Sequence, residues 1–140
     1  MITYVDASLL LKLVIEEEGS ERAGLIWDRA DVLASVVLVV VEGRAALAAA
    51  RRGGRLDSRQ HQQALQEFNT LVDALSIVEV TEGLVDDASH LAESEALRGY
   101  EAVHLAAALS IGSDILTSSD TTLFEAANRR GLHVANPLST

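Results

Sequence analysis

Four acidic residues are placed where their side chains could do chemistry together. Asp6 and Asp120 each follow a short β-branched or apolar run that predicts a buried strand, and each begins a helical pattern. Glu42 and Glu101 lie within helical patterns whose other residues are almost all apolar. Carboxylates that converge in a buried place repel one another unless a cation is bound. The four residues therefore predict a site for a divalent metal ion.

Each of these residues also has a structural interpretation. Asp6 and Asp120 are of a type that is favoured as a helix N-cap, and Glu101 falls in the first turn of its helix, where an acid is favourable. Glu42 could pair with Arg44 or be turned to solvent. Each alternative is reasonable alone, but four acids in matching places favour the metal site.

Phosphoryl-ester chemistry is the usual work of such a site, in which metal ions activate a water and stabilise the leaving oxygen. The chain has no cysteine, so oxygen ligands indicate Mg²⁺ or Mn²⁺ rather than zinc. No dinucleotide, P-loop or nucleophile-elbow motif is present. Ser8 replaces the second Asp of a phosphoaspartyl hydrolase, and the only lysine, Lys12, is not where a receiver domain needs one. His104, one turn beyond Glu101, could approach the site or be a structural histidine.

The elements that must position these residues alternate between strand and helix patterns. Ser35 is expected to cap a long helix that ends at Gly53-Gly54, Asp57 or Ser58 to cap the next helix, and Thr81 another. This alternation predicts one α/β domain over residues 1–140 with a parallel sheet, in which adjacent strands bring Asp6 and Asp120 to the same edge. The expected strands are residues 2–5, 32–34, 77–80, 115–117 and 132–135.

Composition limits the setting and the partners. There is no basic leader and no apolar run long enough to cross a bilayer, which predicts a cytoplasmic protein. The net charge of −10 disfavours nucleic acid as a partner unless local arginines make the contact. The candidates for that contact are Arg51, Arg52 and Arg55, although a solvated helix face is the favoured explanation of this arginine cluster.

Four segments, in register along nearly the whole chain, resemble a known family. They are Tyr-Val-Asp-Ala-Ser at 4–8 with Leu-Leu-Lys-Leu at 10–13, Val-Glu at 41–42, Leu-Arg-Gly-Tyr-Glu-Ala-Val-His-Leu-Ala at 97–106 and Leu-Thr-Ser-Ser-Asp at 116–120. With these segments the chain resembles PIN-domain ribonucleases, specifically VapC-type toxins of bacterial toxin–antitoxin pairs.

The resemblance implies a three-layer α/β/α fold with a five-stranded parallel sheet. It also implies an endoribonuclease that depends on Mg²⁺, for which Mn²⁺ substitutes, and that leaves 5′-phosphate and 3′-hydroxyl ends. The family pairs as homodimers, and a cognate VapB-type antitoxin would neutralise this chain in a hetero-oligomer. By position, the metal-binding and catalytic residues are Asp6, Glu42, Glu101 and Asp120, with Asp6 and Asp120 as the direct ligands.

Position 101 departs from the family, in which it is ordinarily Asp. The extra methylene of Glu101 displaces its carboxylate by about a bond length, enough to disturb octahedral Mg²⁺ geometry. A second hypothesis is therefore a catalytically silent PIN module that keeps only its protein contacts. A third is a phosphatase that uses the same metals on small phosphate esters.

Overall fold

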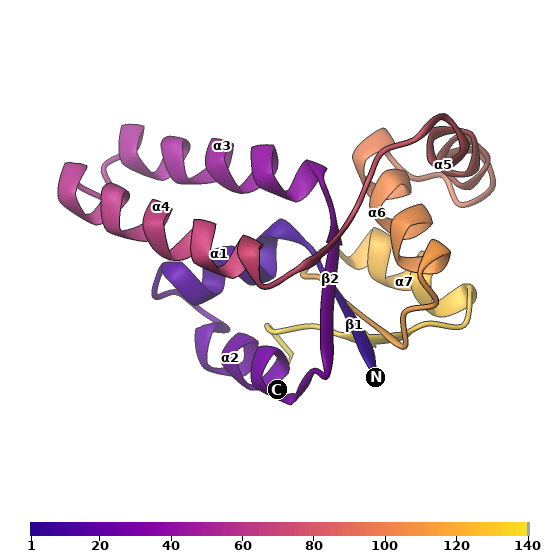
Figure 1. Cartoon of the computed structure of the whole chain (residues 1–140), viewed down its shortest axis with the longest axis horizontal. Coiled ribbons are helices and arrows are strands. Elements are labelled where there is room, and N and C mark those ends of the chain that lie inside the picture. The colour runs from indigo at the N-terminus through magenta and orange to yellow at the C-terminus, as the bar shows by residue number, and fades with distance from the viewer. Residues whose placement is uncertain (140) are drawn as a thin grey trace.

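Residues 1–139, which the computed structural model describes, contain five strands and seven helices (Figure 1). The strands are β1 (Ile2–Val5), β2 (Val32–Val36), β3 (Ser76–Val78), β4 (Ile115–Thr117) and β5 (His133–Ala135). The helices are α1 (Ala7–Val14), α2 (Ser20–Arg29), α3 (Leu38–Arg52), α4 (Ser58–Asp73), α5 (Glu82–Ser94), α6 (Gly99–Ser110) and α7 (Thr121–Arg129).

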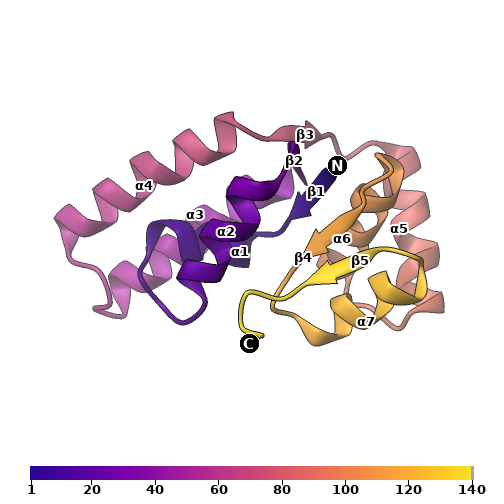
Figure 2. The same cartoon turned by 90° about the horizontal axis from the view of Figure 1, so that it is seen from below.

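The strands form one fully parallel sheet in the order β3-β2-β1-β4-β5. Successive residues of the central strand face opposite sides, as a period of two requires. Tyr4 packs into a core with α5, α6 and α7, whereas Val5 packs into a second core with α1, α3 and α4. Helices therefore cover both faces of the sheet, and the three-layer α/β/α prediction is confirmed (Figure 2).

The pairing of β1 with β4 is what brings two of the predicted acids together. Val5 lies opposite Thr117, so the two strands end level with each other. Asp6 follows the first strand directly, and Asp120 comes three residues after the second. Ligands of open α/β sheets bind at this carboxyl edge.

Several predicted helix ends are confirmed, and one is wrong. Asp57 caps α4 in a capping box with Gln60, and Thr81 caps α5. Ser35 does not cap α3, because it lies inside β2, where its buried hydroxyl donates a hydrogen bond to the Val5 carbonyl oxygen (2.7 Å). The strand continues to Val36, which pairs with β3, and α3 begins at Leu38.

Helices α3 and α4 form a long hairpin that extends away from the sheet (Figure 1). Gly43 lets the two helices approach closely, because a Cβ at that position would overlap the Phe68 ring. This close contact lies directly after Glu42 in α3. None of the helices in residues 1–139 has the length and apolar character needed to cross a bilayer.

Candidate active site

A cavity of about 400 Å³ lies at the carboxyl edge of β1 and β4. Three of the four predicted acids, Asp6, Glu42 and Asp120, line it, and no lysine or arginine does. Glu101 is not in its wall. The full lining is Asp6, Ala7, Ser8, Glu42, Tyr100, His104, Ser119, Asp120 and Leu123.

Asp6 serves both as a cap and as part of the cavity wall. Its Oδ1 accepts hydrogen bonds from the Leu9 backbone N–H (3.2 Å) and from the Ser8 hydroxyl (2.6 Å). The side chain is buried at 9% exposure. The N-cap interpretation is thus correct, and it holds the carboxylate at the edge of the cavity.

Asp120 is an N-cap in the same manner. Its Oδ1 accepts hydrogen bonds from the backbone N–H groups of Thr122 (3.0 Å) and Leu123 (3.3 Å) at the start of α7. The Tyr100 hydroxyl lies 3.4 Å from its other oxygen. The same carboxylate contacts Glu101, from the first turn of α6.

Glu101 contacts Asp120 but does not line the cavity, and it is only 3% exposed. Its Oε1 accepts a hydrogen bond from the Arg98 backbone N–H (2.8 Å), which closes the first turn of α6. Burial raises the pKa of Glu101, and the hydrogen bond with Asp120 raises it further. Burial also acts to raise the pKa of Asp120, but hydrogen bonds from Glu101 and the α7 backbone outweigh it and lower that pKa. Of the two contacting carboxyl groups, Glu101 is thus the one whose pKa is raised and Asp120 the one whose pKa is lowered.

Glu42 has a histidine as its partner rather than an arginine. His104 Nε2 lies 2.7 Å from Glu42 Oε1, and His104 Nδ1 lies 2.7 Å from the hydroxyl of Tyr4. The sequence left His104 open between the site and the core, and it belongs to both: it is 2% exposed and lines the cavity. In the sequence, His104 comes three residues after Glu101, and residues at this spacing share a helix face. This spacing was the feature that could place His104 near the site.

The comparisons with known proteins agree with this architecture. The family model of the PIN domain matches residues 3–129. This chain belongs to the PIN domain family. Two relatives from Mycobacterium tuberculosis, "Ribonuclease VapC45" of strain CDC 1551 / Oshkosh and "Ribonuclease VapC49" of strain ATCC 25618 / H37Rv, are each 39% identical over 136 residues, which is 96% of this chain and 94% of theirs.

Solved structures share the PIN fold across nearly the whole chain. PAE2754 from Pyrobaculum aerophilum superimposes with a TM-score of 0.72 at 24% identity, covering 96% of this chain and 83% of that one. A toxin–antitoxin complex from Klebsiella pneumoniae gives 0.70 at 17% identity, covering 99% of each chain. The resemblance to VapC-type PIN domains and the five-stranded parallel sheet are thereby confirmed.

The cavity of this PIN domain fits a hydrated cation better than a bare one. Within residues 1–139, no three His, Cys, Asp or Glu side chains are arranged to enclose a metal ion. Mg²⁺ needs no such cage, because it keeps several waters and uses one or two carboxylates. Ser119 Oγ, a buried hydroxyl of the cavity wall with no hydrogen-bond partner among the described residues, fits a water of such an ion.

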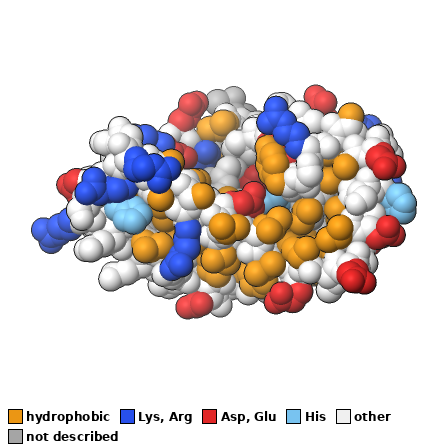
Figure 3. Space-filling model, turned by 90° about the horizontal axis from the view of Figure 1, so that it is seen from above, with side chains coloured by type: hydrophobic (Ala, Val, Ile, Leu, Met, Phe, Trp, Pro, Cys, Tyr) orange, Lys and Arg blue, Asp and Glu red, His pale blue; other side chains and the backbone are white. Residues whose placement is uncertain are grey.

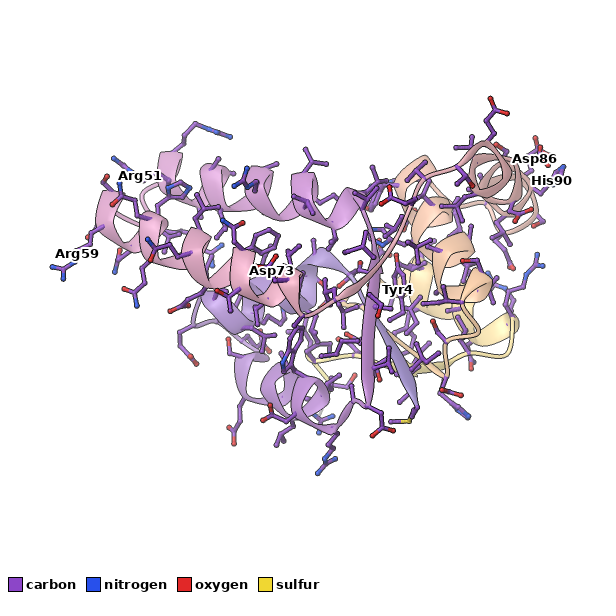
Figure 4. All side chains as sticks on the ribbon, viewed as in Figure 1. Tyr4, Arg51, Arg59, Asp73, Asp86 and His90 are labelled. Atoms are coloured by element: carbon purple, nitrogen blue, oxygen red, sulfur yellow. The ribbon has the colours of Figure 1, made fainter. Side chains whose placement is uncertain are left out.

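The predicted RNA-binding arginines are not at the cavity. Arg51 and Arg52 are exposed at the far end of α3, nine and ten residues beyond Glu42, which is about 14 Å along a helix. Arg51 and Arg59 lie at the outer tip of the α3–α4 hairpin (Figure 4), where basic side chains gather on the surface (Figure 3). Arg55 donates to Glu17 (2.9 Å).

Proposed function

We propose that this PIN domain is an endoribonuclease toxin that depends on Mg²⁺ or Mn²⁺ and is neutralised by a cognate antitoxin. The observation that carries the proposal is the cavity lined by three carboxylates and by no lysine or arginine. A polyanion such as RNA is drawn to that place only when cations fill it. The two relatives named as ribonucleases favour this function over a catalytically silent module.

The four acids divide the work. Asp6 and Asp120 would hold the ion, since each is fixed by backbone N–H donors at the edge of the cavity. Glu101 contacts and holds Asp120, and Glu42, anchored through one oxygen by His104, would hold the ion through a water on its other oxygen and so orient that water. When bound, the ion would supply Lewis-acid activation of that water and stabilise the charge on the leaving oxygen.

A VapB-type antitoxin is the proposed partner, and a homodimer the proposed assembly. The Klebsiella pneumoniae neighbour is itself a toxin–antitoxin complex. Hydrophobic side chains gather on one face over α3, α5 and α6 (Figure 3). Val41, next to Glu42, is 62% exposed, and Tyr100 in the cavity wall is 45% exposed, which supports a protein contact beside the site. A cytoplasmic location stays a prediction.

The test is cleavage of total bacterial RNA with Mg²⁺, with Mn²⁺ and with EDTA. The unaltered chain is run beside Asp6→Asn and Glu101→Asp. We expect metal-dependent cutting by the unaltered chain and a loss in Asp6→Asn larger than the roughly 10–100-fold typical of a group that only supports a metal ligand. Asn caps a helix about as well as Asp, so the variant should fold normally.

Glu101→Asp decides whether the departure at position 101 matters. We expect similar cutting by the unaltered chain and by this variant, because Glu101 contacts Asp120 instead of lining the cavity. Cutting by Glu101→Asp alone would show that this chain carries a disabled site. Silence from both, together with intact antitoxin binding, would reject the nuclease and support the binding module. Turnover of an aryl phosphate that Asp6→Asn removes would indicate a phosphatase.

A further inference from the structure

Three side chains from three different elements form an unbroken chain of hydrogen bonds that reaches the cavity. Tyr4 comes from β1, His104 from α6 and Glu42 from α3, and both bonds are 2.7 Å long. Tyr4 and His104 are 0% and 2% exposed, and their rings meet edge to face at 78°. Only the Glu42 end is open to solvent, with 27% of its side chain exposed. We refer to these three residues as the Tyr4 relay.

The buried end of the Tyr4 relay favours one direction for its hydrogen bonds. The backbone N–H of Val36 donates to the Tyr4 hydroxyl oxygen (3.2 Å). Burial raises the pKa of Tyr4, so the hydroxyl keeps its proton and can donate it to His104 Nδ1. An imidazole that accepts at Nδ1 carries its own proton on Nε2, and that proton points to Glu42 Oε1.

We infer that Tyr4 and His104 are positioning residues: Tyr4 fixes His104 in the tautomer with its proton on Nε2, and His104 thereby orients the Glu42 carboxylate in the active site. One oxygen of Glu42 is then engaged by His104, and the other is left for the cavity. This inference rests on the proposed function, because it assigns Glu42 a task there. The inference concerns the direction of the Tyr4–His104 and His104–Glu42 hydrogen bonds, and it requires no change in the charge of these residues.

The connectivity argues that the Tyr4 relay does more than satisfy a buried ring. Val36, which donates to Tyr4, ends β2, and Glu42 follows six residues later in α3. The relay thus bonds to the β2–α3 segment twice, at Val36 through Tyr4 and at Glu42 itself, and it ties this segment to β1 and to α6. No charged cap fixes the start of α3, because its N-cap is Val37 and has no side-chain hydrogen bond. The relay instead fixes this part of α3 through Glu42, the residue that lines the cavity.

The first measurement is a long-range ¹H–¹⁵N spectrum of the histidine rings in the metal-free protein. It reports which ring nitrogen carries the proton. We expect His104 to show one neutral tautomer with the proton on Nε2, and Tyr4→Phe to disturb it. A proton on Nδ1 in the unaltered chain would overturn the inference, whether or not the protein cleaves RNA.

The second measurement is the affinity for Mn²⁺ alone, by calorimetry, in two matched variants. His104→Gln keeps an N–H donor near the position of Nε2, whereas His104→Leu has similar bulk and no donor. We expect His104→Leu to lower Mn²⁺ affinity by about 10–100-fold, the usual effect of losing a group that orients a metal ligand, and His104→Gln to retain most of it. His90→Leu, on the outer side of α5 (Figure 4), is the control and should change nothing.

The outcomes separate the relay from the proposed function. If the unaltered chain cleaves RNA and folded His104→Leu binds Mn²⁺ equally well, the relay is wrong and the nuclease stands. If neither the unaltered chain nor any variant binds Mn²⁺ or cleaves RNA, the metal-dependent function is wrong, and with it the role given to Glu42. Should His104→Leu fail to fold, the tautomer in Tyr4→Phe and the affinity of His104→Gln decide the question.

Discussion

The two ends of helix α1 show opposite treatments of buried charge. At its N-terminal end, Asp6 faces a cavity with two further carboxylates and no lysine or arginine. At its C-terminal end, Lys12 is only 9% exposed but bonds to Glu17 (3.1 Å), which also accepts from Arg55 (2.9 Å). We call Lys12, Glu17 and Arg55 the cation-paired cluster and contrast it with the acidic cavity.

The pKa of Glu17 and the pKa of Glu101, which contacts the cavity residue Asp120, shift in opposite directions. Burial acts to raise the pKa of Glu17, but its bonds to Arg55 and Lys12 outweigh burial and lower that pKa. Burial raises the pKa of Glu101, and its neighbour Asp120 raises it further instead of opposing it. The chain neutralises its own charge in one place and leaves it unneutralised in the other. A charge conflict that the fold tolerates is expected at a functional site, where a ligand completes the balance.

The largest expected effect is the loss of RNA cleavage in Asp120→Asn, without a matching loss of stability. Cleavage should fall by more than about 100-fold, because the substitution removes a proposed ion ligand. Stability without metal should change little, because Asn still caps α7 and two effects oppose each other: the lowered pKa of Asp120 means that its ionised form favours the fold, whereas Asp120 raises the pKa of Glu101. RNA cleavage and thermal unfolding in EDTA measure the two effects. A clear loss of stability would show that the acidic cavity is a structural feature and would break the contrast.

Lys12→Met should lower the stability of the fold and leave RNA cleavage unchanged. The substitution leaves Glu17 partly buried with only the exposed Arg55 as partner, and we expect a loss of about 2 kcal/mol in the free energy of unfolding. RNA cleavage per folded molecule should stay the same. Urea unfolding measures the loss, and the double variant Lys12→Met with Glu17→Gln should recover most of it. Failure of the double variant to recover would mean that Lys12 acts through packing alone.

The fold could be predicted from sequence because its signals are local. Periodicity, paired glycines and the caps Asp6, Asp57, Thr81 and Asp120 each depend on a few neighbouring residues, and all lie where expected. Ser35 was misassigned because its partner, the Val5 carbonyl, is thirty residues away. The same limit applies in the site: the pattern marked Glu42 as needing a partner but could not name His104, which arrives from α6.

Stability at low pH tests the cation-paired cluster through Glu17. Its folded pKa lies below the unfolded value, so its contribution is present above about pH 4.5 and is lost as the pH falls through the folded pKa. Glu17→Gln should therefore cost up to about 1 kcal/mol at neutral pH and little at pH 3. Thermal unfolding of both proteins across that range measures it. A difference that stays constant with pH would assign the effect to something other than this charge.

The smallest expected effects distinguish Arg55 from its neighbours Arg51 and Arg52. Arg55→Ala should lower stability slightly, by about 0.5 kcal/mol, since its side chain is 59% exposed and solvent screens its bond to Glu17. Arg51→Ala and Arg52→Ala should leave stability unchanged, because both residues are exposed and the structure gives them no ion pair among the described residues. If these two contact RNA phosphates, each substitution should reduce the salt dependence of RNA binding by about one unit of slope. If Arg51→Ala and Arg52→Ala bind RNA with the same salt dependence as the unaltered chain, the tip of the α3–α4 hairpin does not contact RNA, and the acidic cavity is the remaining predicted RNA contact.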